Sequence, residues 1–255
     1  MMTPTARRAA ILQQARSGQR LVVEALALEF AASRETIRRD LAELDRQGLL
    51  RRVHGGATAA PRELDEGPFH HRMRQQVAAK RAMARHVAEG LLPGDSLFID
   101  TGSTTLFLAE EIARRKGLII ITNSAEIAAL CQKGEGNRVV LVGGEFRGPG
   151  RETVGLLAVA QIGQLRAARA VLTVASVTER GVFDIDPQEA EIARAMIAQA
   201  DEVTVLADGS KMGRAGVFEV CPMAAVGRIV TDSMEKPLRD AAKAAGVRVE
   251  IVSLY

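Results

Sequence analysis

A polar segment near the middle of the chain combines residue types that bind anions. It holds a carboxylate, a glycine and a run of hydroxyls: Asp100, Thr101, Gly102, Ser103, Thr104 and Thr105. At the start of a helix, free backbone N–H groups and the hydroxyls of residues 103–105 would hold a phosphate, and Gly102 would let the backbone approach it closely. The segment lacks the spacing and the lysine of a P-loop, so a nucleoside triphosphate is not expected. The alternative is a well-capped helix without a ligand.

Three further segments carry polar groups that suit a small ligand. Their residues are Thr122, Asn123 and Ser124 in the first, Gly143, Gly144 and Glu145 in the second, and Asp208, Gly209, Ser210 and Lys211 in the third. Lys211 would neutralise a phosphate or polarise a carbonyl, and Asp208 would hold that lysine or a sugar hydroxyl. Each segment alone is also consistent with an ordinary loop. Together they predict a convergent polar pocket.

Strand and helix patterns alternate after residue 93, and each polar segment follows a predicted strand. Strands are expected at residues 97–100, 118–122, 139–142, 170–175, 203–207, 228–231 and 247–252. Helices are expected at residues 104–115, 125–132, 158–165, 188–200 and 236–245. This alternation predicts an α/β domain with a mainly parallel sheet, in which ligands bind beyond the carboxyl ends of the strands. The order of Asp186, Pro187 and Glu189 marks one of the helix starts.

A second constellation, at residues 33–44, predicts a DNA recognition helix. Ser33 is a good N-cap, and three apolar residues at helical spacing form a stripe: Ile37, Leu41 and Leu44. Polar and cationic residues lie off that stripe and would face base edges or phosphates: Arg34, Thr36, Arg38 and Arg39. The alternative is an amphipathic helix with a solvated charged face.

Two helical runs before residue 33 complete the pattern of a helix-turn-helix. They span residues 7–16 and 21–30, and a short join leads into the recognition helix. Residues 49–56 then predict a short hairpin, or wing, which contains His54 and carries Arg51 and Arg52 towards phosphates. The charge agrees with this interpretation, because residues 1–60 hold 10 Arg against 6 Asp and Glu, whereas the whole chain has a net charge of only +3.

The composition indicates how the domains are joined and where the protein works. Residues 58–68 indicate an exposed linker, and we expect a helix at 69–91 to couple a DNA-binding domain at 1–57, across a linker at 58–75, to a ligand-binding domain at 76–255. Hydrophobic residues make up 47% of the chain, which is ample for a core. Cys131 and Cys221 are isolated, and no signal peptide or membrane span is visible. We therefore expect a reduced, cytoplasmic protein without a metal or cofactor.

The chain resembles a known family at both ends. Two N-terminal motifs, Thr36-Ile37-Arg38-Arg39-Asp40-Leu41 and His54-Gly55-Gly56-Ala57, are similar to the winged helix-turn-helix of the DeoR family of bacterial transcriptional regulators. The strand-end segments resemble the effector domain of that family, which is related in fold to ribose-5-phosphate isomerase. The resemblance covers nearly the whole chain. It implies an all-α winged helix-turn-helix followed by a mainly parallel α/β domain that senses phosphorylated sugars or related metabolites.

The resemblance also implies roles for single residues. Residues 103–105 would take the phosphate, and the sugar portion would lie near four side chains: Asp100, Asn123, Glu189 and Lys211. The chain departs from the family pattern at Ala25, Ala32 and Met212, and at residues 183–186, a stretch that would shape the choice of ligand.

We expect a DNA-binding repressor of a carbohydrate catabolic operon that is not an enzyme. Its partners would be an operator in double-stranded DNA, a small phosphorylated sugar as effector, and further copies of itself in a dimer or tetramer. Effector binding would change the spacing of paired recognition helices and hence the affinity for DNA. Two alternatives remain. One is a sugar-phosphate isomerase that uses Asp100, Asp208 and Lys211 for proton transfer, and the other is a DNA-binding adaptor without a ligand.

Overall fold

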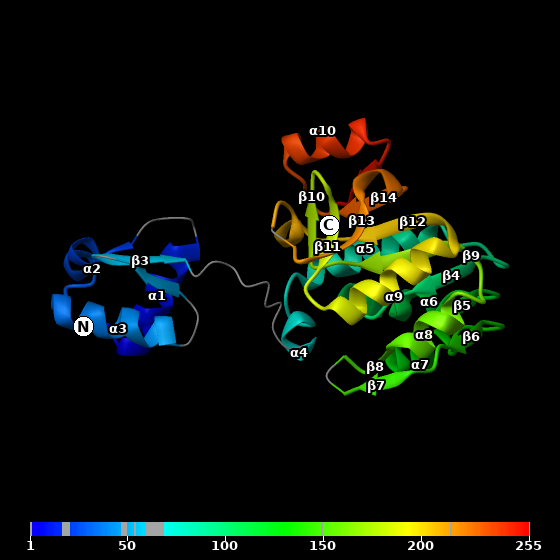
Figure 1. The fold of residues 1–255 in the computed structure, drawn as a ribbon, viewed down its shortest axis with the longest axis horizontal. Helices are drawn as coiled ribbons and strands as arrows, with labels where there is room; N and C mark the ends of the chain where they lie inside the picture. The colour runs from blue at the N-terminus through cyan, green and yellow to red at the C-terminus, as the bar shows by residue number, and fades with distance from the viewer. Residues whose placement is uncertain are drawn as a thin grey trace. The chain divides into compact units, whose positions relative to one another are not determined.

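The computed structural model divides the chain into two compact units, residues 1–65 and residues 66–255 (Figure 1). It describes residues 2–16, 21–46, 50–53, 55–59, 69–148, 150–214 and 216–254. Each unit has a hydrophobic core of its own, formed by different sets of buried residues.

The first unit is a helix-turn-helix with a small antiparallel sheet. Its elements are α1 (Pro4–Arg16), β1 (Leu21–Val22), α2 (Val23–Glu29), α3 (Arg34–Arg46), β2 (Leu50–Val53) and β3 (Gly56–Ala59). Ile37, Leu41 and Leu44 are buried in its core, which confirms the apolar stripe expected on α3. β2 and β3 pair antiparallel and form the predicted wing.

β1 differs from the expectation of one helix at residues 21–30. Leu21 and Val22 pair with Ala57 and Gly56 of β3, and α2 follows them. A Cβ on Gly56 would lie 1.9 Å from the carbonyl oxygen of Leu21, so this pairing depends on glycine. The partner strand is distant in sequence, and helical periodicity therefore cannot reveal the pairing.

The second unit contains a seven-stranded sheet in which every pairing is parallel. In spatial order the strands are β15 (Arg248–Ile251), β14 (Arg228–Thr231), β12 (Ala200–Leu206), β9 (Ala167–Thr173), β4 (Ser96–Ile99), β5 (Ile119–Thr122) and β6 (Arg138–Leu141). The central strands are almost wholly buried, as is usual for a parallel sheet covered on both faces. This arrangement confirms the predicted α/β domain.

Helices cover both faces of this sheet and define two hydrophobic cores (Figure 1). One core is formed with α5 (Val77–Glu89), α6 (Ser103–Ile112) and α7 (Ala125–Cys131), and the other with α8 (Leu156–Ile162), α9 (Pro187–Ala198) and α10 (Lys236–Ala244). Among the described residues, no helix is long and apolar enough to span a membrane.

Two smaller antiparallel sheets lie outside the predicted alternation. One is a hairpin of β7 (Glu145–Arg147) and β8 (Glu152–Val154), and the other has the order β10 (Ser176–Thr178), β11 (Gly181–Asp184) and β13 (Phe218–Pro222). These strands form sheets of their own outside the central sheet, so the strand–helix alternation that predicts the central sheet does not reveal them. An antiparallel bridge between Ser124 and Glu152 joins β8 to the segment that follows β5.

The helix expected at residues 69–91 is broken into two helices. A short helix, α4 (Phe69–Arg72), precedes α5, and Gln76 between them adopts a left-handed conformation with φ of 51°. Met73, between the two helices, packs against the same core as both of them. The apolar periodicity therefore continues across the break, which is why it predicts a single helix.

Candidate functional site

The order of the seven-stranded sheet reverses between β4 and β9. From β4 the chain moves outward through β5 to β6, whereas from β9 it moves the other way through β12 and β14 to β15. In sheets of this kind the loops at the reversal leave a crevice beyond the carboxyl ends of the strands, and ligands bind there. In this protein the loops after β4 and β9 are the ones at that reversal.

Asp100 and Gly102 hold the loop after β4 against the end of β9. The carboxylate oxygens of Asp100 accept hydrogen bonds from the backbone N–H of Thr173, at 3.1 Å and 2.9 Å. A Cβ on Gly102 would lie 2.2 Å from the hydroxyl oxygen of Thr173, so a larger residue does not fit without displacement. Burial raises the pKa of Asp100 well above its usual value, although the N–H of Thr173 favours the charged form.

Ser103, Thr104 and Thr105 form the first turn of α6 and are buried. The N-cap is Gly102, which offers no side-chain acceptor, so the N–H groups of this turn have no side-chain cap. The Thr105 hydroxyl lies 2.9 Å from the carbonyl oxygen of Asp100 and 3.1 Å from that of Gly102, and it donates within the loop. Ser103 and the helix N-terminus are thus better suited than Thr105 to an anion.

Lys80 of α5 contacts this turn, although no sequence motif predicts it. Its ammonium donates hydrogen bonds to the hydroxyl of Ser103 at 2.9 Å and to the carbonyl oxygen of Arg72 at 2.6 Å. Only 3% of Lys80 is exposed. Burial lowers the pKa of Lys80 to about 8, against the attraction of Asp208. The sequence signal for Lys80 is a lysine on the buried face of a helix, because lysine is seldom fully buried without a partner.

Asp208 and Lys211 lie on the loop that follows β12. Asp208 is the N-cap of the 3₁₀ turn η1 (Gly209–Lys211), and its carboxylate accepts from the backbone N–H of Ser210 at 3.0 Å. Burial and, to a smaller extent, the charge of Arg214 lower the pKa of Lys211 to about 8. Asp208 lies close enough to Lys80 for its negative charge to raise the pKa of that lysine. The loop after β12 therefore brings a second lysine, Lys211, to the same strand ends.

Thr122 is the last residue of β5, and Asn123, which follows it, links the loop after β4 to β8. The side chain of Asn123 accepts from the hydroxyl of Thr101 at 3.2 Å and donates to the carbonyl oxygen of Thr153 at 3.0 Å. The Thr122 hydroxyl accepts from the backbone N–H of Ser124 at 3.1 Å. Asn123 therefore lies beside the first polar segment, whereas Thr122 shapes its own turn.

An acidic region lies near Asp100. Its side chains come from β8, β11 and the start of α9: Glu152, Asp184, Asp186 and Glu189. Burial and, next in size, the negative charge of Glu152 raise the pKa of Glu189 to about 8. Burial opposes charge on Asp186 as well, but its 2.9 Å ion pair with Arg147 and the N–H groups of α9 lower its pKa.

Gly143 and Gly144 lie beyond β6 and contact α8 and β8. The N–H of Gly143 donates to the side-chain oxygen of Gln161 at 3.0 Å. A Cβ on Gly144 would lie 2.7 Å from the carbonyl oxygen of Val154, and its φ of 153° also favours glycine. The two glycines let β8 and α8 pack closely, and they are not joined to Asp100 by the contacts of the described residues.

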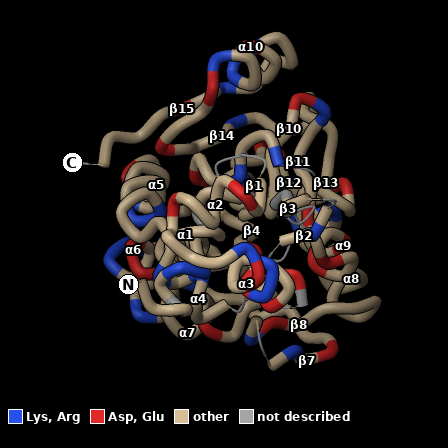
Figure 2. The backbone as a smooth tube through the Cα atoms, turned by 90° about the vertical axis from the view of Figure 1, so that its left-hand side faces the viewer, with Lys and Arg blue, Asp and Glu red and all other residues tan. Residues whose placement is uncertain are grey.

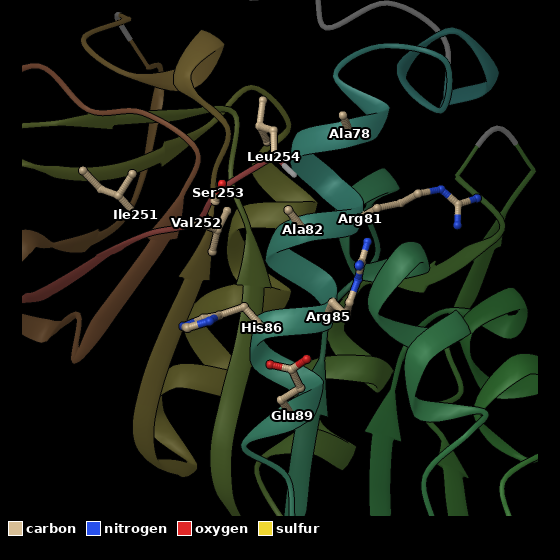
Figure 3. Close-up of a pocket in the computed structure, with 10 residues that line it drawn as sticks. All are labelled: Ala78, Arg81, Ala82, Arg85, His86, Glu89, Ile251, Val252, Ser253 and Leu254. Carbon is tan, nitrogen blue, oxygen red and sulfur yellow. The ribbon is translucent and has the colours of Figure 1, made fainter.

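The pocket shown in Figure 3 is not formed by the predicted effector-binding residues. Its volume is about 470 Å³, and it is lined by α5 and the C-terminal residues 251–254. Arg81 on its wall lies 3.5 Å from Glu110, and His86 lies 2.8 Å from Glu250. None of the effector-binding residues predicted from the sequence lines it.

In the first unit, α3 exposes the predicted cationic residues. Its N-cap is confirmed, because the hydroxyl of Ser33 accepts from the backbone N–H of Thr36 at 3.0 Å. Arg34, Arg38 and Arg39 are all exposed, and Figure 2 marks the basic positions of this helix in blue. The recognition-helix hypothesis needs such an exposed cationic face.

Other charged residues of this unit differ in their burial. Asp40 is buried and accepts from Nε of Arg7 at 2.6 Å, which ties α3 to α1. Arg52 of β2 is exposed. The side chain of Arg51 and the whole of His54 lie outside the described residues.

Both units match known domain families. Residues 7–63 match the DeoR-like helix-turn-helix domain, and residues 75–233 match the DeoR C terminal sensor domain. The chain belongs to the DeoR family. As a DeoR-family member it joins a DNA-binding helix-turn-helix to a sensor domain, as its motifs predict.

Two curated relatives match the DeoR-family chain over most of their lengths. Transcriptional repressor AccR of Agrobacterium fabrum (strain C58) is 37% identical over 229 residues, which cover 89% of each chain. The Glycerol-3-phosphate regulon repressor of Escherichia coli (strain K12) is 32% identical over 233 residues, 91% of this chain and 92% of the relative. Both are repressors rather than enzymes. The prediction of a transcriptional regulator is therefore confirmed, and the isomerase alternative is wrong.

Among solved structures, ribose 5-phosphate isomerase A from Methanocaldococcus jannaschii is similar to part of the chain. It is 18% identical and has a TM-score of 0.38, with 53% of this chain and 54% of that chain covered. A likeness of this extent carries no inference about ligand or activity.

Proposed function

We propose that this DeoR-family chain represses a carbohydrate catabolic operon and that a phosphorylated sugar, bound in the strand-end crevice, controls its affinity for DNA. One observation carries the proposal: the Lys80 ammonium contacts both Ser103 and the backbone of Arg72. Arg72 belongs to α4, the first described element after the segment that leads from the DNA-binding unit. An anion at Ser103 would therefore act on the same ammonium that holds α4.

The phosphate would be bound by Ser103, the N-terminus of α6, Lys80 and Lys211. Ammonium groups form strong, charge-assisted hydrogen bonds with phosphate, and helix N-termini attract anions. Both lysines are held largely out of water with lowered pKa values, so a phosphate would relieve an existing electrostatic cost. The effector-binding residues predicted from the sequence remain part of this proposal, and we add Lys80 to them.

The ligand class is supported by a relative. The name of the Escherichia coli repressor refers to a glycerol-3-phosphate regulon, and glycerol 3-phosphate is a phosphorylated polyol. A ligand of this kind has an anionic end for the lysines and hydroxyls for the carboxyl groups of the same crevice.

DNA would be bound by the exposed face of α3 and by the wing. Arg34, Arg38 and Arg39 would contact base edges and phosphates of the major groove, with Ser33 and Thr36 at the helix start. Arg52 would contact a phosphate, and Arg51 and His54 are assigned to the wing from the sequence alone. A homo-oligomer would place two such helices on one operator, because one small domain provides few specific contacts.

A thermal-shift measurement on the full chain tests the effector proposal. Inorganic phosphate and sugar phosphates are expected to raise the unfolding midpoint, and the parent sugars are not, because only ligands of the folded state stabilise it. Ser103→Ala should remove the shift, whereas Ser253→Ala, at an exposed position in the C-terminal tail, should keep it. A shift produced by free sugars alone, or by no compound of the panel, would contradict the proposal.

A further inference from the structure

Glu152 and Glu189 form a carboxyl pair in the acidic region of the sensor crevice. Glu152 lies on β8 with 2% of its surface exposed, and Glu189 lies in the first turn of α9. Burial is the main cause that raises the pKa of Glu189, and the charge of Glu152 is the next. α9 also packs against β8, so the two side chains are neighbours in a setting that disfavours charge.

One carboxylate oxygen of Glu152 lacks a hydrogen-bond donor. Its Oε2 is buried, and none of the described residues donates to it. Neighbouring carboxyls are satisfied: Asp184 accepts from the backbone N–H of Ile185 at 2.7 Å, and Asp186 pairs with Arg147 at 2.9 Å. A buried acceptor without a donor is unfavourable, so a donor on a ligand would be stabilised at this oxygen.

Backbone pairing directs Glu152 to the strand ends. Glu152 forms an antiparallel bridge with Ser124, and the N–H of Thr153 donates to the carbonyl oxygen of Asn123 at 2.8 Å. Asp100, at the end of β4, is close enough to Glu152 and Glu189 for their charges to raise its pKa. The carboxyl pair therefore lies near the loop after β4, which leads into the turn proposed to bind the phosphate.

The nearby arginines do not offset the effect of burial on the pKa of Glu152. Arg147 and Arg72 favour the charged form of Glu152, but burial outweighs both, and the pKa of Glu152 remains raised. Among the described residues, no group of His, Cys, Asp and Glu side chains is arranged to hold a metal ion. An organic ligand with hydrogen-bond donors thus fits the pair better than a divalent cation does.

We propose that Glu152 and Glu189 bind the end of the effector that carries no phosphate, and that they require hydrogen-bond donors there. This inference rests on the proposed function, since the phosphate must bind at Ser103 and Lys80. The ligand class that follows is the monophosphate of a polyol, a sugar or an amino sugar. A hydroxyl would donate to Oε2 of Glu152, and an ammonium would also balance the negative charge. A second phosphate or a carboxylate would bring no hydrogen-bond donor to Oε2 of Glu152, and its charge would be unfavourable in a region that is buried and already acidic.

The test compares phosphates that differ only at the far end, by calorimetric titration of the full chain. Glycerol 3-phosphate is matched with 3-phosphoglycerate, and sorbitol 6-phosphate with 6-phosphogluconate, so that a terminal CH₂OH becomes a carboxylate in each pair. We expect the alcohol to bind at least about tenfold more tightly than the acid. In the double variant Glu152→Gln with Glu189→Gln, which removes charge but keeps shape, the difference should fall below about threefold. Glu191→Gln, at an exposed position of the same helix, should keep the wild-type preference.

Each other outcome overturns the inference in a distinguishable way. Equal binding of alcohol and acid by the wild type would overturn the inference and leave the proposed function standing, because phosphate is still bound. A preference that persists in the double variant would mean that other groups select the ligand. If inorganic phosphate binds and no alcohol of the panel binds more tightly than it does, the carboxyl pair recognises no hydroxyl. If neither inorganic phosphate nor any panel member binds, the proposed function fails, and this inference fails with it.

Discussion

The ammonium of Lys80 lies 2.9 Å from the hydroxyl of Ser103, so a buried cation from α5 reaches the first turn of α6. The same ammonium is 2.6 Å from the carbonyl oxygen of Arg72. The turn that would bind phosphate and the helix nearest to the interdomain segment therefore share one hydrogen-bond donor.

Replacing Lys80 tests this relationship. Lys80→Met keeps most of the side-chain volume and removes the charge, and we expect the affinity for inorganic phosphate to fall by about 10- to 100-fold, since hydrogen bonds to charged groups contribute roughly 1.5–3 kcal/mol. Calorimetric titration measures it. Lys133→Met, at an exposed position, is the matched control. An unchanged affinity in Lys80→Met would place the phosphate elsewhere.

The close approach of Gly102 to Thr173 makes a prediction about stability. Gly102→Ala should lower the free energy of unfolding by about 1–3 kcal/mol, because an added methyl group has to displace the end of β9. Gly163→Ala is the control, since a Cβ there would have no neighbour closer than 3.5 Å. Chemical denaturation compares the two variants. If the Gly102→Ala variant is as stable as the Gly163→Ala variant, the loop after β4 is not packed as described.

The two lysines predict opposite effects of pH on stability and on ligand affinity. Burial lowers the pKa of Lys80 and of Lys211 to about 8, from a usual value of 10.5. Between these values the unfolded chain binds more protons than the folded one, so these groups make the free energy of unfolding rise with pH. Phosphate affinity should instead fall as pH rises through about 8, because the ammonium charge is lost and Glu189 becomes charged in the same range.

Calorimetric titration with inorganic phosphate at pH 7.5 and 9.5 checks the second effect. We expect an affinity about tenfold or more lower at the higher pH, where the ligand itself stays dianionic. The double variant Lys80→Met with Lys211→Met should show a much flatter profile. A flat profile in the wild type would mean that neither lysine binds the anion.

Arg38 provides the corresponding test in the DNA-binding unit. Arg38→Ala should weaken binding by about 1–3 kcal/mol to a fragment selected by the wild type from a random pool, since an arginine on a base edge contributes that much. Phosphate binding should not change. Arg180→Ala, at an exposed position of the second unit, is the control. Unchanged DNA affinity in Arg38→Ala would show that α3 is not the recognition helix.

The main fold was predictable because its signals are local in sequence. The stripe of Ile37, Leu41 and Leu44 and the cap at Ser33 define α3, and alternating apolar runs define the parallel sheet. β1 and the two small sheets depend on pairing between distant or very short segments, which periodicity does not reveal. The break at Gln76 was hidden because apolar residues continue across it.

The candidate site was predictable where polar residues follow strands directly. Asp100 and Asn123 lie close together because the carboxyl ends of β4 and β5 are adjacent. Lys80 and Glu152 could not be placed, because tertiary packing alone brings a helix and a hairpin to those strand ends. The sequence nevertheless gives one indication of Lys80, because it is a charged residue among the buried positions of α5.

The most direct test of effector control is a fluorescence anisotropy titration of the selected DNA fragment, with and without the sugar phosphate found by thermal shift. For the wild type we predict that this ligand changes the DNA affinity by at least about fivefold, a coupling of roughly 1 kcal/mol. In the double variant Ser103→Ala with Lys211→Ala, we predict unchanged DNA affinity without ligand and no response to it. A full response in that variant would show that the ligand controlling DNA binding acts at another site.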